Sequence, residues 1–316
     1  MIKYTIKKYE ENDYTLWNDF VNQAKNATFL FHRDFMEYHK DRFEDFSLLV
    51  FEDEKLRAIL PANKQGKSIH SHQGLTYGGL VFSSKLKAEK VESILDEILF
   101  FLKENRIETF YYKSVPDFYF KEGNKEVDFF LFRRGAILER KEMNLAINLS
   151  TNLKISKSKL KHFRRIENLD LHMLEEEDFN PFWEKILQPR LLEKFGVKPV
   201  HSKQEMTYLK SQVPQNIKQF SAYLNGEIIA GVTIFETING VKSQYGATSK
   251  KGEKFRALDF LFINLIYKYK QEGKCFFDMG IVDDENEVGY NLGLLKQKEE
   301  LGCSVYNQDF FKINLL

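Results

Sequence analysis

A group of basic residues stands where a strand pattern gives way to a long helical pattern, in residues 249–256. It contains Lys250, Lys251, Gly252, Lys254 and Arg256. The first amides of a helix are unpaired and lie at the positive end of its dipole, so together with basic side chains they attract phosphate. Glycine allows a ligand to approach the backbone closely. The segment therefore predicts a loop that holds the pyrophosphate of a cofactor. A merely polar surface loop is the alternative, because no GxxxxGK[ST] or GxGxxG motif is present.

A second segment with chemical potential follows the next strand pattern, which ends at Asp278 and Gly280. Residues 289–302 pass from a glycine-rich polar loop into a short helix that carries Lys296 and Lys298. Open α/β sheets bind ligands beyond the carboxyl ends of their strands, so we expect Asp278, Gly280 and this loop to form the wall of a site. A lysine here would neutralise an oxyanion or a phosphate, although exposed helix lysines without such a role are commoner.

In the first half of the chain, residues 68–80 (SIHSHQGLTYGGL) combine histidines, a glutamine and a tyrosine in one strand and turn. His70 and His72 are two residues apart and would share a face of a strand. We assign both of them, with Tyr77 and with Tyr245 from the second half, to substrate binding. Two imidazoles can bind a metal, but no third ligand stands out, and we predict no metal site.

The highest concentration of positive charge lies in residues 152–169. Six basic residues fall within twelve positions, namely Lys154, Lys157, Lys159, Lys161, Arg164 and Arg165. The segment predicts a helix that faces a phosphate-bearing ligand, or equally a solvated connector between two domains.

The elements that must position these residues recur in the same order. Residues 45–60 alternate around a polar turn and predict a hairpin, which an extended stretch (69–82), a helical pattern (84–105) and a strand (107–113) follow. A second hairpin at 219–235, with its Asn-Gly turn, precedes a strand through Tyr245, a helix at 257–271 and a strand at 275–281. Gly78 and Gly246 are 168 residues apart (246 − 78), and the strand starts Ile107 and Cys275 are also 168 residues apart (275 − 107). This recurrence predicts a duplicated domain, with a division into residues 1–150 and 151–316; a chance recurrence is the alternative.

Composition restricts the class of protein. The 316 residues include 47 Lys+Arg and 46 Asp+Glu, so the net charge of +1 argues against a dedicated DNA-binding protein. Hydrophobic residues make up 43%, enough for a packed core. Two cysteines and the absence of a long apolar stretch predict a cytoplasmic protein with no disulfide scaffold and no membrane span.

At the quoted segments the sequence resembles the FemAB-like branch of the GNAT acyltransferase superfamily, whose members carry two GNAT-like domains in tandem. YGATS followed by FFDMGI is similar to the family's Tyr-Gly-Ala/Ser strand end and Tyr/Phe-Asp-Phe-Gly-Gly segment, and GLLKQKEELG is similar to its closing G-L/V-Y-x-F-K-x-x-F-G motif. SHQGLTYGG extends a looser match into the first half. The resemblance implies a mixed α/β (α+β) fold of two GNAT-like domains, each with a mixed, mostly antiparallel sheet flanked by helices.

The resemblance also implies an N-acyltransferase that moves an acyl group from acetyl-CoA or another acyl-CoA to the amine of a small acceptor, such as an amino sugar, a nucleotide sugar or an amino acid derivative. Lys298 matches the lysine of the closing motif, which in some members stabilises the tetrahedral intermediate. His201, Asp278 and His72 are the candidate proton acceptors, and the sequence does not separate them. Residues 249–256 stand where GNAT enzymes hold the pyrophosphate of coenzyme A.

Two alternatives remain open. A FemAB-type enzyme that uses aminoacyl-tRNA would contact the nucleic acid through residues 154–165, although the near-zero net charge favours this less. A GNAT-like protein that binds a ligand without catalysis would explain the departures from the family motifs at Met279, Leu295 and Gln297. The sequence does not indicate an oligomeric state.

Overall fold

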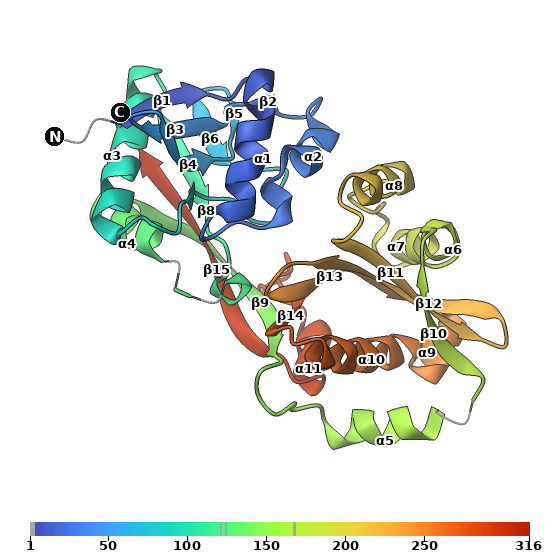
Figure 1. Cartoon of the computed structure of the whole chain (residues 1–316). Helices are drawn as coiled ribbons and strands as arrows, with labels where there is room; N and C mark the ends of the chain where they lie inside the picture. Colours follow the sequence, from blue (N-terminus) through green and yellow to red (C-terminus); the bar gives the residue numbers. More distant parts are fainter. Residues whose placement is uncertain (1–3, 121, 124, 167–168) are drawn as a thin grey trace. The chain divides into compact units, whose positions relative to one another are not determined.

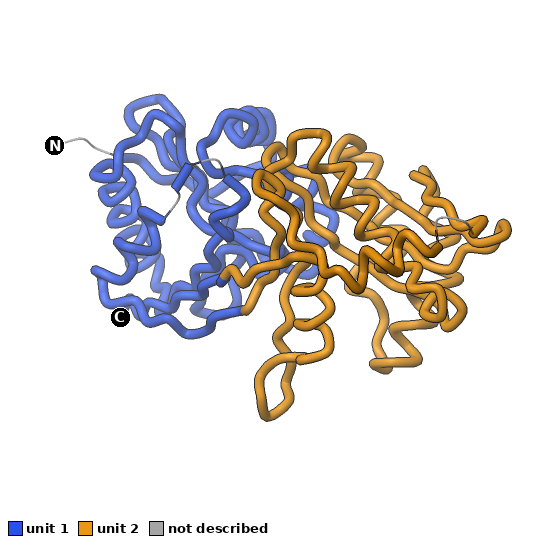
Figure 2. The backbone as a smooth tube through the Cα atoms, turned by 90° about the horizontal axis from the view of Figure 1, so that it is seen from below, with its two compact units in different colours: residues 1–142, 307–316 blue, residues 143–306 orange. Residues whose placement is uncertain are grey.

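The structure is a computed structural model that describes residues 4–120, 122–123, 125–166 and 169–316. It divides into two compact units, of which unit 1 contains residues 1–142 and 307–316 and unit 2 contains residues 143–306 (Figure 2). Strands β9 (Ile137–Asn148) and β15 (Ser304–Asn314) each have residues in both units. The predicted division after residue 150 differs from these units mainly in the last ten residues, which belong to unit 1, and the division into two GNAT-like domains at that position stays a prediction.

Unit 1 combines a small antiparallel sheet with a mixed sheet. The strands of the first, in spatial order, are β1 (Tyr4–Lys8), β3 (Leu48–Glu52), β4 (Lys55–Leu60) and β7 (Val81–Phe82). The second runs β9, β15, β8 (Thr109–Lys113), β6 (Ser68–Ser71), β5 (Asn63–Gln65) and β2 (Glu44–Asp45). The helices are α1 (Tyr14–Gln23), α2 (Arg33–Met36), α3 (Ala88–Glu104) and α4 (Glu126–Arg133).

Helix α3 supplies much of the core of unit 1. Its buried residues Val91, Ile94, Leu95, Ile98 and Leu102 follow the helical repeat and pack against strand residues of both sheets. The helix follows β7 and precedes β8, and β8 pairs in parallel with β6. The last strand, β15, pairs antiparallel with β8, and its Phe311 and Ile313 join the same core. Unit 1 is therefore completed by residues from the end of the sequence.

Unit 2 is built on one mixed sheet with the order β10 (Leu171–Glu176), β11 (Ile217–Leu224), β12 (Glu227–Glu236), β13 (Gly240–Thr248), β14 (Phe276–Ile281) and β9. Only β13 and β14 are parallel. Its helical segments are α5 (Lys157–Ile166), α6 (Asn180–Phe182), a π-helical turn (Trp183–Leu187), α7 (Gln188–Phe195), α8 (Lys203–Gln212), α9 (Lys250–Phe255), α10 (Ala257–Gln271) and α11 (Leu292–Glu300).

The helices of unit 2 cover both faces of its sheet. Helices α6, α7 and α8 lie on one face, and α10 lies on the other with α5 beyond it (Figure 1). Gly231 of β12 allows α6 to pack closely against the sheet, because a Cβ at this position would overlap the Phe182 ring. Helix α8 begins with the capping box that the sequence predicts, in which the Ser202 hydroxyl accepts from the Glu205 amide at 3.1 Å.

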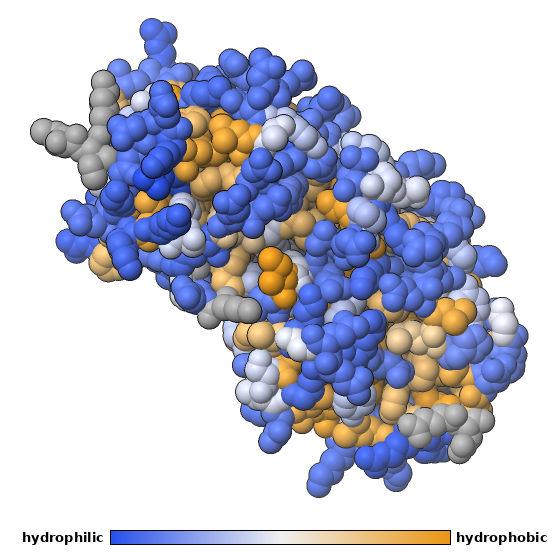
Figure 3. All heavy atoms as spheres, in the orientation of Figure 1, coloured by the Kyte–Doolittle hydropathy of each residue, from blue (hydrophilic) through white to orange (hydrophobic). Residues whose placement is uncertain are grey.

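The expected fold class is confirmed, because each unit has a mixed, mostly antiparallel sheet flanked by helices. In both units a hairpin precedes a long helix and a further strand, as predicted. In unit 1 the single extended stretch expected at 69–82 is wrong, because β6 and β7 are two short strands of different sheets with residues 72–80 between them. In the described residues no helix is long and apolar enough to cross a membrane. Hydrophilic side chains predominate on the face drawn in Figure 3, with smaller apolar areas among them.

Candidate functional site

Strands β13 and β14 of unit 2 pair in parallel over a short stretch and then diverge. The ladder between β13 and β14 joins only residues 240–242 to residues 276–278. Beyond it, β13 continues beside β12 as far as Thr248, whereas β14 turns at Gly280, with φ +75°, and Ile281 pairs with Asn144 of β9. Among the strand pairs of the described residues, none occupies the other edge of β13 after Lys242. A strand edge of this kind offers backbone groups to an extended ligand.

Lys298 lies at this point of separation. It is 6% exposed, and its Nζ donates hydrogen bonds to the carbonyl oxygens of Gly280 at 3.0 Å and Ile281 at 2.8 Å. Burial, and secondarily the charge of Lys242, lowers the pKa of Lys298 to about 8. An ammonium has three donors, and in the described part of the chain two of them have acceptors. The third can reach a ligand, so the lysine is suited to stabilising negative charge below pH 8.

Asp278 forms a buried ion pair that the sequence analysis did not anticipate. Its Oδ2 lies 3.1 Å from Nζ of Lys242, its register partner on β13, and its Oδ1 accepts from the Gly280 amide at 2.7 Å. Asp278 is 1% exposed, and its two contacts hold the Gly280 turn in place. It thereby orients the backbone of the site, and its role as a proton acceptor stays a prediction.

A bulge in β13 brings Tyr245 to the same face of the sheet as Lys242. Lys242 pairs with Phe235 of β12 and Tyr245 pairs with Thr233, with a shift of register between them. Thr233 and Phe235 are two apart and share a face, so their partners share it too. In a regular strand, residues three apart would face opposite sides, and the bulge is what places both side chains together.

Tyr245 and His201 form a hydrogen-bonded pair on this face. The Tyr245 hydroxyl accepts from the His201 backbone amide at 3.1 Å and lies 2.6 Å from its Nδ1. The tautomer of the imidazole decides which of the two groups donates in the shorter contact. Burial raises the pKa of Tyr245 to about 12, and its ring packs edge-on against Trp183 from the π-helical turn. The pair can pass a proton between a tyrosine hydroxyl and an imidazole.

The predicted phosphate loop at residues 249–256 is wrong in its local structure. Residues 250–255 form the short helix α9, and the Ser249 hydroxyl caps it by accepting from the Gly252 amide at 3.0 Å. A Cβ at Gly252 would overlap Thr248 and the Ile229 carbonyl, so packing against the sheet requires this glycine.

The basic side chains of this segment have different surroundings. Lys250 pairs with Glu193 and Lys251 with Glu227, each at 2.5 Å. Lys254 and Arg256 are exposed, and they are the basic residues of this segment without an ion-pair partner among the described residues. The cofactor contact of the whole segment stays a prediction.

Helix α5 contains the other basic segment. Lys159 is buried against Asp259, with 2.7 Å between Nζ and Oδ2. The exposed residues Lys157, Lys161, Arg164 and Arg165 follow helical spacing along one side, and no carboxylate among the described residues pairs with them. Helix α5 therefore presents a basic face to solvent, as predicted, and uses one lysine to attach itself to α10.

The histidines of unit 1 do not share a strand face. β6 ends at Ser71, and His70 stacks on Tyr111 of β8, with ring centroids 4.6 Å apart. His72 is 4% exposed and stacks on His39 at 5.4 Å, and its Nδ1 accepts from the Gly74 amide at 3.1 Å. Burial lowers the pKa of His72 to about 3, so it is a poor proton acceptor.

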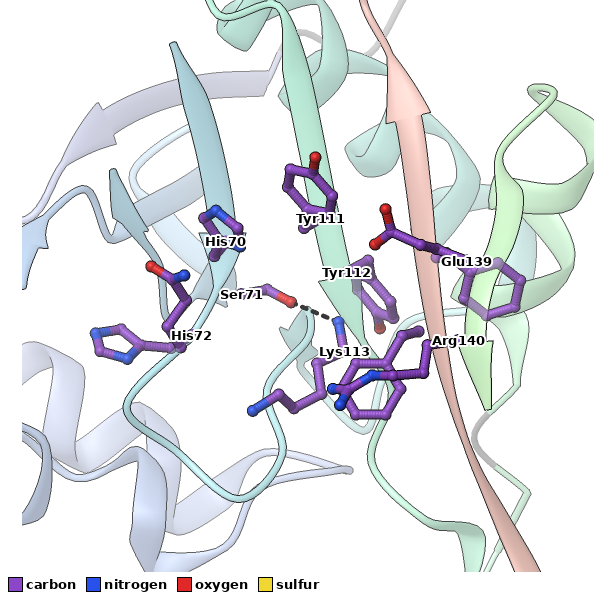
Figure 4. Close-up of a pocket in the computed structure, with 11 residues that line it drawn as sticks. His70, Ser71, His72, Tyr111, Tyr112, Lys113, Glu139 and Arg140 are labelled. Atoms are coloured by element: carbon purple, nitrogen blue, oxygen red, sulfur yellow. Dashed lines mark hydrogen bonds between the residues drawn. The ribbon is translucent and has the colours of Figure 1, made fainter. Parts of the chain in front are cut away.

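A pocket of about 370 Å³ in unit 1 contains both predicted histidines in its wall. Its other lining residues are Ser71, Gln73, Tyr111, Tyr112, Lys113, Glu139, Arg140, Phe310 and Phe311 (Figure 4). Tyr77 is not among them, because it is 1% exposed and donates to the Thr28 hydroxyl at 2.9 Å. Its assignment to substrate binding is corrected to a core position.

The structure therefore places Asp278 and Lys298 at the Gly280 turn and pairs Tyr245 with His201 on the face of the sheet that Lys242 shares. In unit 1, His70 and His72 line the same pocket with different ring partners. The sequence analysis missed Lys242. The parallel pairing of β13 with β14, which places Lys242 opposite Asp278, could have indicated it. Lys113 and Arg140, which lie on strands without a recognisable motif, were missed as well. In the described part of the chain, no group of three or more His, Cys, Asp or Glu residues is arranged to hold a metal ion.

The fold is similar to several solved structures. FemX matches with a TM-score of 0.69 and 12% identity, covering 96% of each chain. L-PGS from Bacillus licheniformis matches with a TM-score of 0.57 and 14% identity, covering 85% of this chain and 83% of the other. A tandem GNAT protein from the clavulanic acid biosynthesis pathway matches with a TM-score of 0.54 and 10% identity, covering 99% of both chains.

These similarities define the fold of the chain as that of tandem GNAT proteins and FemX, which confirms at the level of fold the resemblance found in the sequence. No model of a protein family matches the sequence. No curated protein matches it either.

Proposed function

We propose that the protein is an N-acyltransferase that moves an acyl group from an acyl-CoA to the amine of a small acceptor, an amino sugar, a nucleotide sugar or an amino acid derivative. The observation that carries this proposal is the position of Lys298 at the separation of β13 and β14, beside the Lys242–Asp278 pair. The open edge of β13 suits an extended amide-containing donor, and a buried ammonium next to it suits an acyl transfer that develops negative charge.

The reaction needs few specialised groups. The acceptor amine attacks the thioester carbonyl carbon, the carbonyl oxygen becomes an oxyanion, and the C–S bond then breaks to release the thiolate of coenzyme A. Lys298 stabilises the oxyanion with its third N–H. His201 takes the proton from the amine by way of Tyr245, whose hydroxyl lies 2.6 Å from Nδ1. Lys254 and Arg256 contact the donor's phosphates. The Lys242–Asp278 pair fixes the Gly280 turn and with it the acceptors of Lys298.

The test offers acyl-CoA thioesters of increasing chain length with a panel of amino sugars, nucleotide sugars and amino acids, and follows thiol release. In Lys298→Met, we expect kcat to fall about 100- to 1000-fold, the usual loss for one oxyanion donor. Lys296→Ala is the matched control, because Lys296 is exposed on the same helix. The proposal fails if no thioester is consumed with any amine, or if Lys298→Met retains wild-type turnover.

A second candidate is aminoacyl transfer from aminoacyl-tRNA, and the basic face of α5 favours it. Lys157, Lys161, Arg164 and Arg165 are exposed along one side of the helix. Contacts of this kind release counterions, so retention of tRNA would weaken steeply with salt. We expect Lys161→Ala with Arg164→Ala to reduce both retention and its salt dependence, while exposed Lys55→Ala in unit 1 leaves them unchanged. No retention at low salt would remove this candidate.

A further inference from the structure

The pocket in unit 1 is lined by residues of four neighbouring strands, β9, β15, β8 and β6. Tyr111 and Lys113 are two apart on β8 and share a face, and Phe310 of β15 is the register partner of Lys113. His70, on the other side of β8, is the register partner of Tyr111. Glu139 and Arg140 of β9 also line the pocket (Figure 4). The alternation of the strands therefore gathers aromatic rings and charged groups on one surface.

Two cations line this pocket and one carboxylate opposes them. Nζ of Lys113 donates to the Leu75 carbonyl at 2.6 Å, and no carboxylate among the described residues forms an ion pair with it. Arg140 lies with its guanidinium carbon 3.8 Å from the centre of the Phe310 ring and pairs with Glu142 at 2.7 Å, which leaves further N–H donors. Glu139 is the only carboxylate among the described residues that line the pocket, and Glu142 offsets part of the charge of Arg140. Lys113, which has no carboxylate partner in the described part of the chain, is the group that favours an anion.

Apart from Ser71 and Gln73, the remaining wall of the pocket is aromatic. The rings of His70 and Tyr111 are nearly parallel, with 4° between their planes, and both are only half-buried. Phe310 is half-buried beside Lys113. A volume of about 370 Å³ exceeds what an isolated phosphate fills and falls within the range of sites for small metabolites. Flat apolar walls of this kind pack against a ring.

We propose that this pocket binds a small molecule in which a ring carries one phosphate or carboxylate group, of the size of a sugar phosphate or a nucleoside monophosphate. The anionic group contacts Lys113 and Arg140, and the ring packs against the aromatic side chains of Tyr111, His70 and Phe310. The proposal concerns binding to unit 1 and stands whether or not unit 2 transfers acyl groups.

The test is isothermal titration calorimetry on the full chain with four probes: cytidine 5′-monophosphate, glucose 6-phosphate, cytidine and inorganic phosphate. The titrations contain no coenzyme A, because its own phosphorylated nucleoside belongs to the ligand class proposed for this pocket; the variants below distinguish this site from any other phosphate site. We expect at least one of the two ring phosphates to bind, and cytidine and inorganic phosphate to bind at least about tenfold more weakly. Which of the two binds more tightly identifies the kind of ring.

Variants then locate the site. We expect Arg140→Ala and Lys113→Met each to weaken the ring phosphate about tenfold, since each removes one charge-assisted contact. Arg133→Ala is the control, because Arg133 is an exposed basic residue of α4 that does not line the pocket. If Lys113→Met does not fold, Arg140→Ala decides alone, because Arg140 is exposed. The proposal is overturned if neither ring phosphate binds, or if Arg140→Ala leaves binding unchanged.

Discussion

The pH dependence of stability tests the environment of Lys298 directly. Its pKa is about 8 in the folded protein, against 10.5 for an ordinary lysine. Below pH 8 the amine is protonated in both the folded and the unfolded chain. Between pH 8 and 10.5 the folded protein has released the proton and the unfolded chain still binds it, so the free energy of unfolding rises with pH. A shift of this size corresponds to a rise of about 3 kcal/mol.

Replacing the residue by methionine separates this effect from others. Lys298→Met cannot titrate, and it leaves the Gly280 and Ile281 carbonyls without the donor that reaches them at 3.0 and 2.8 Å. Each lost hydrogen bond lowers the free energy of unfolding by about 1 to 1.5 kcal/mol, while removal of the buried charge raises it by a similar amount at pH 7. We therefore expect the free energies of unfolding of the variant and the wild type to differ by less than about 2 kcal/mol at pH 7. At pH 10.5 the value for the variant should be lower, relative to wild type, by about 3 kcal/mol more.

Urea unfolding at pH 7, 8, 9 and 10 measures both proteins, with thiol release followed over the same range. Lys113 of unit 1 also has a pKa lowered to about 8 by burial, but it contributes equally to both proteins, so their difference isolates Lys298. Wild-type turnover should decline above pH 8 as the ammonium is lost. If the free energy of unfolding changes with pH in the same way in both proteins, Lys298 does not have the lowered pKa on which the proposed reaction depends.

Three further predictions concern other positions. The pKa of His72 is lowered to about 3, so below pH 6.5 the unfolded chain binds a proton that the folded protein does not. The wild-type free energy of unfolding should therefore fall by up to about 1.4 kcal/mol per pH unit between pH 6.5 and 4, and urea unfolding of His72→Phe should lack this fall. Gly231→Ala should destabilise unit 2 by about 1 to 3 kcal/mol in the same assay, because the new methyl group overlaps the Phe182 ring. Tyr245→Phe should lower kcat about a hundredfold with an unchanged circular dichroism spectrum, and full activity would exclude its hydroxyl from proton transfer.

Elements with a clear period could be predicted from the sequence. The helix expected at 257–271 is α10, and the hairpin expected around Asn225 and Gly226 is formed by β11 and β12. Both depend on local signals, the spacing of apolar residues in one case and a turn with positive φ in the other. Of the two alternatives for the basic segment at 152–169, a helix is present over Lys157–Ile166, whereas a phosphate-bearing ligand for it stays a prediction.

The contacts within the site depend on pairing between distant strands, which leaves no local signal. Lys242 meets Asp278 because two strands separated by a helix pair in parallel, and Tyr245 joins them because of a bulge. Gly252 was interpreted as a place for phosphate, yet its small size is required by the Ile229 carbonyl of another strand. Residue type alone does not distinguish a glycine needed for a ligand from one needed for packing.

The position of β15 has a consequence for synthesis. Unit 1 obtains the strand beside β8 from residues 307–316, and Gln308 of that strand donates to the carbonyls of Thr76 and Ser114 at 3.1 and 3.2 Å. A ribosome that has made residues 1–142 must still add all of residues 143–306 before this strand exists. At usual elongation rates the delay is about 10 to 30 s, during which the edge of β8 is open to other partners. Unit 1 therefore cannot complete its sheet until residues 307–316 have been made.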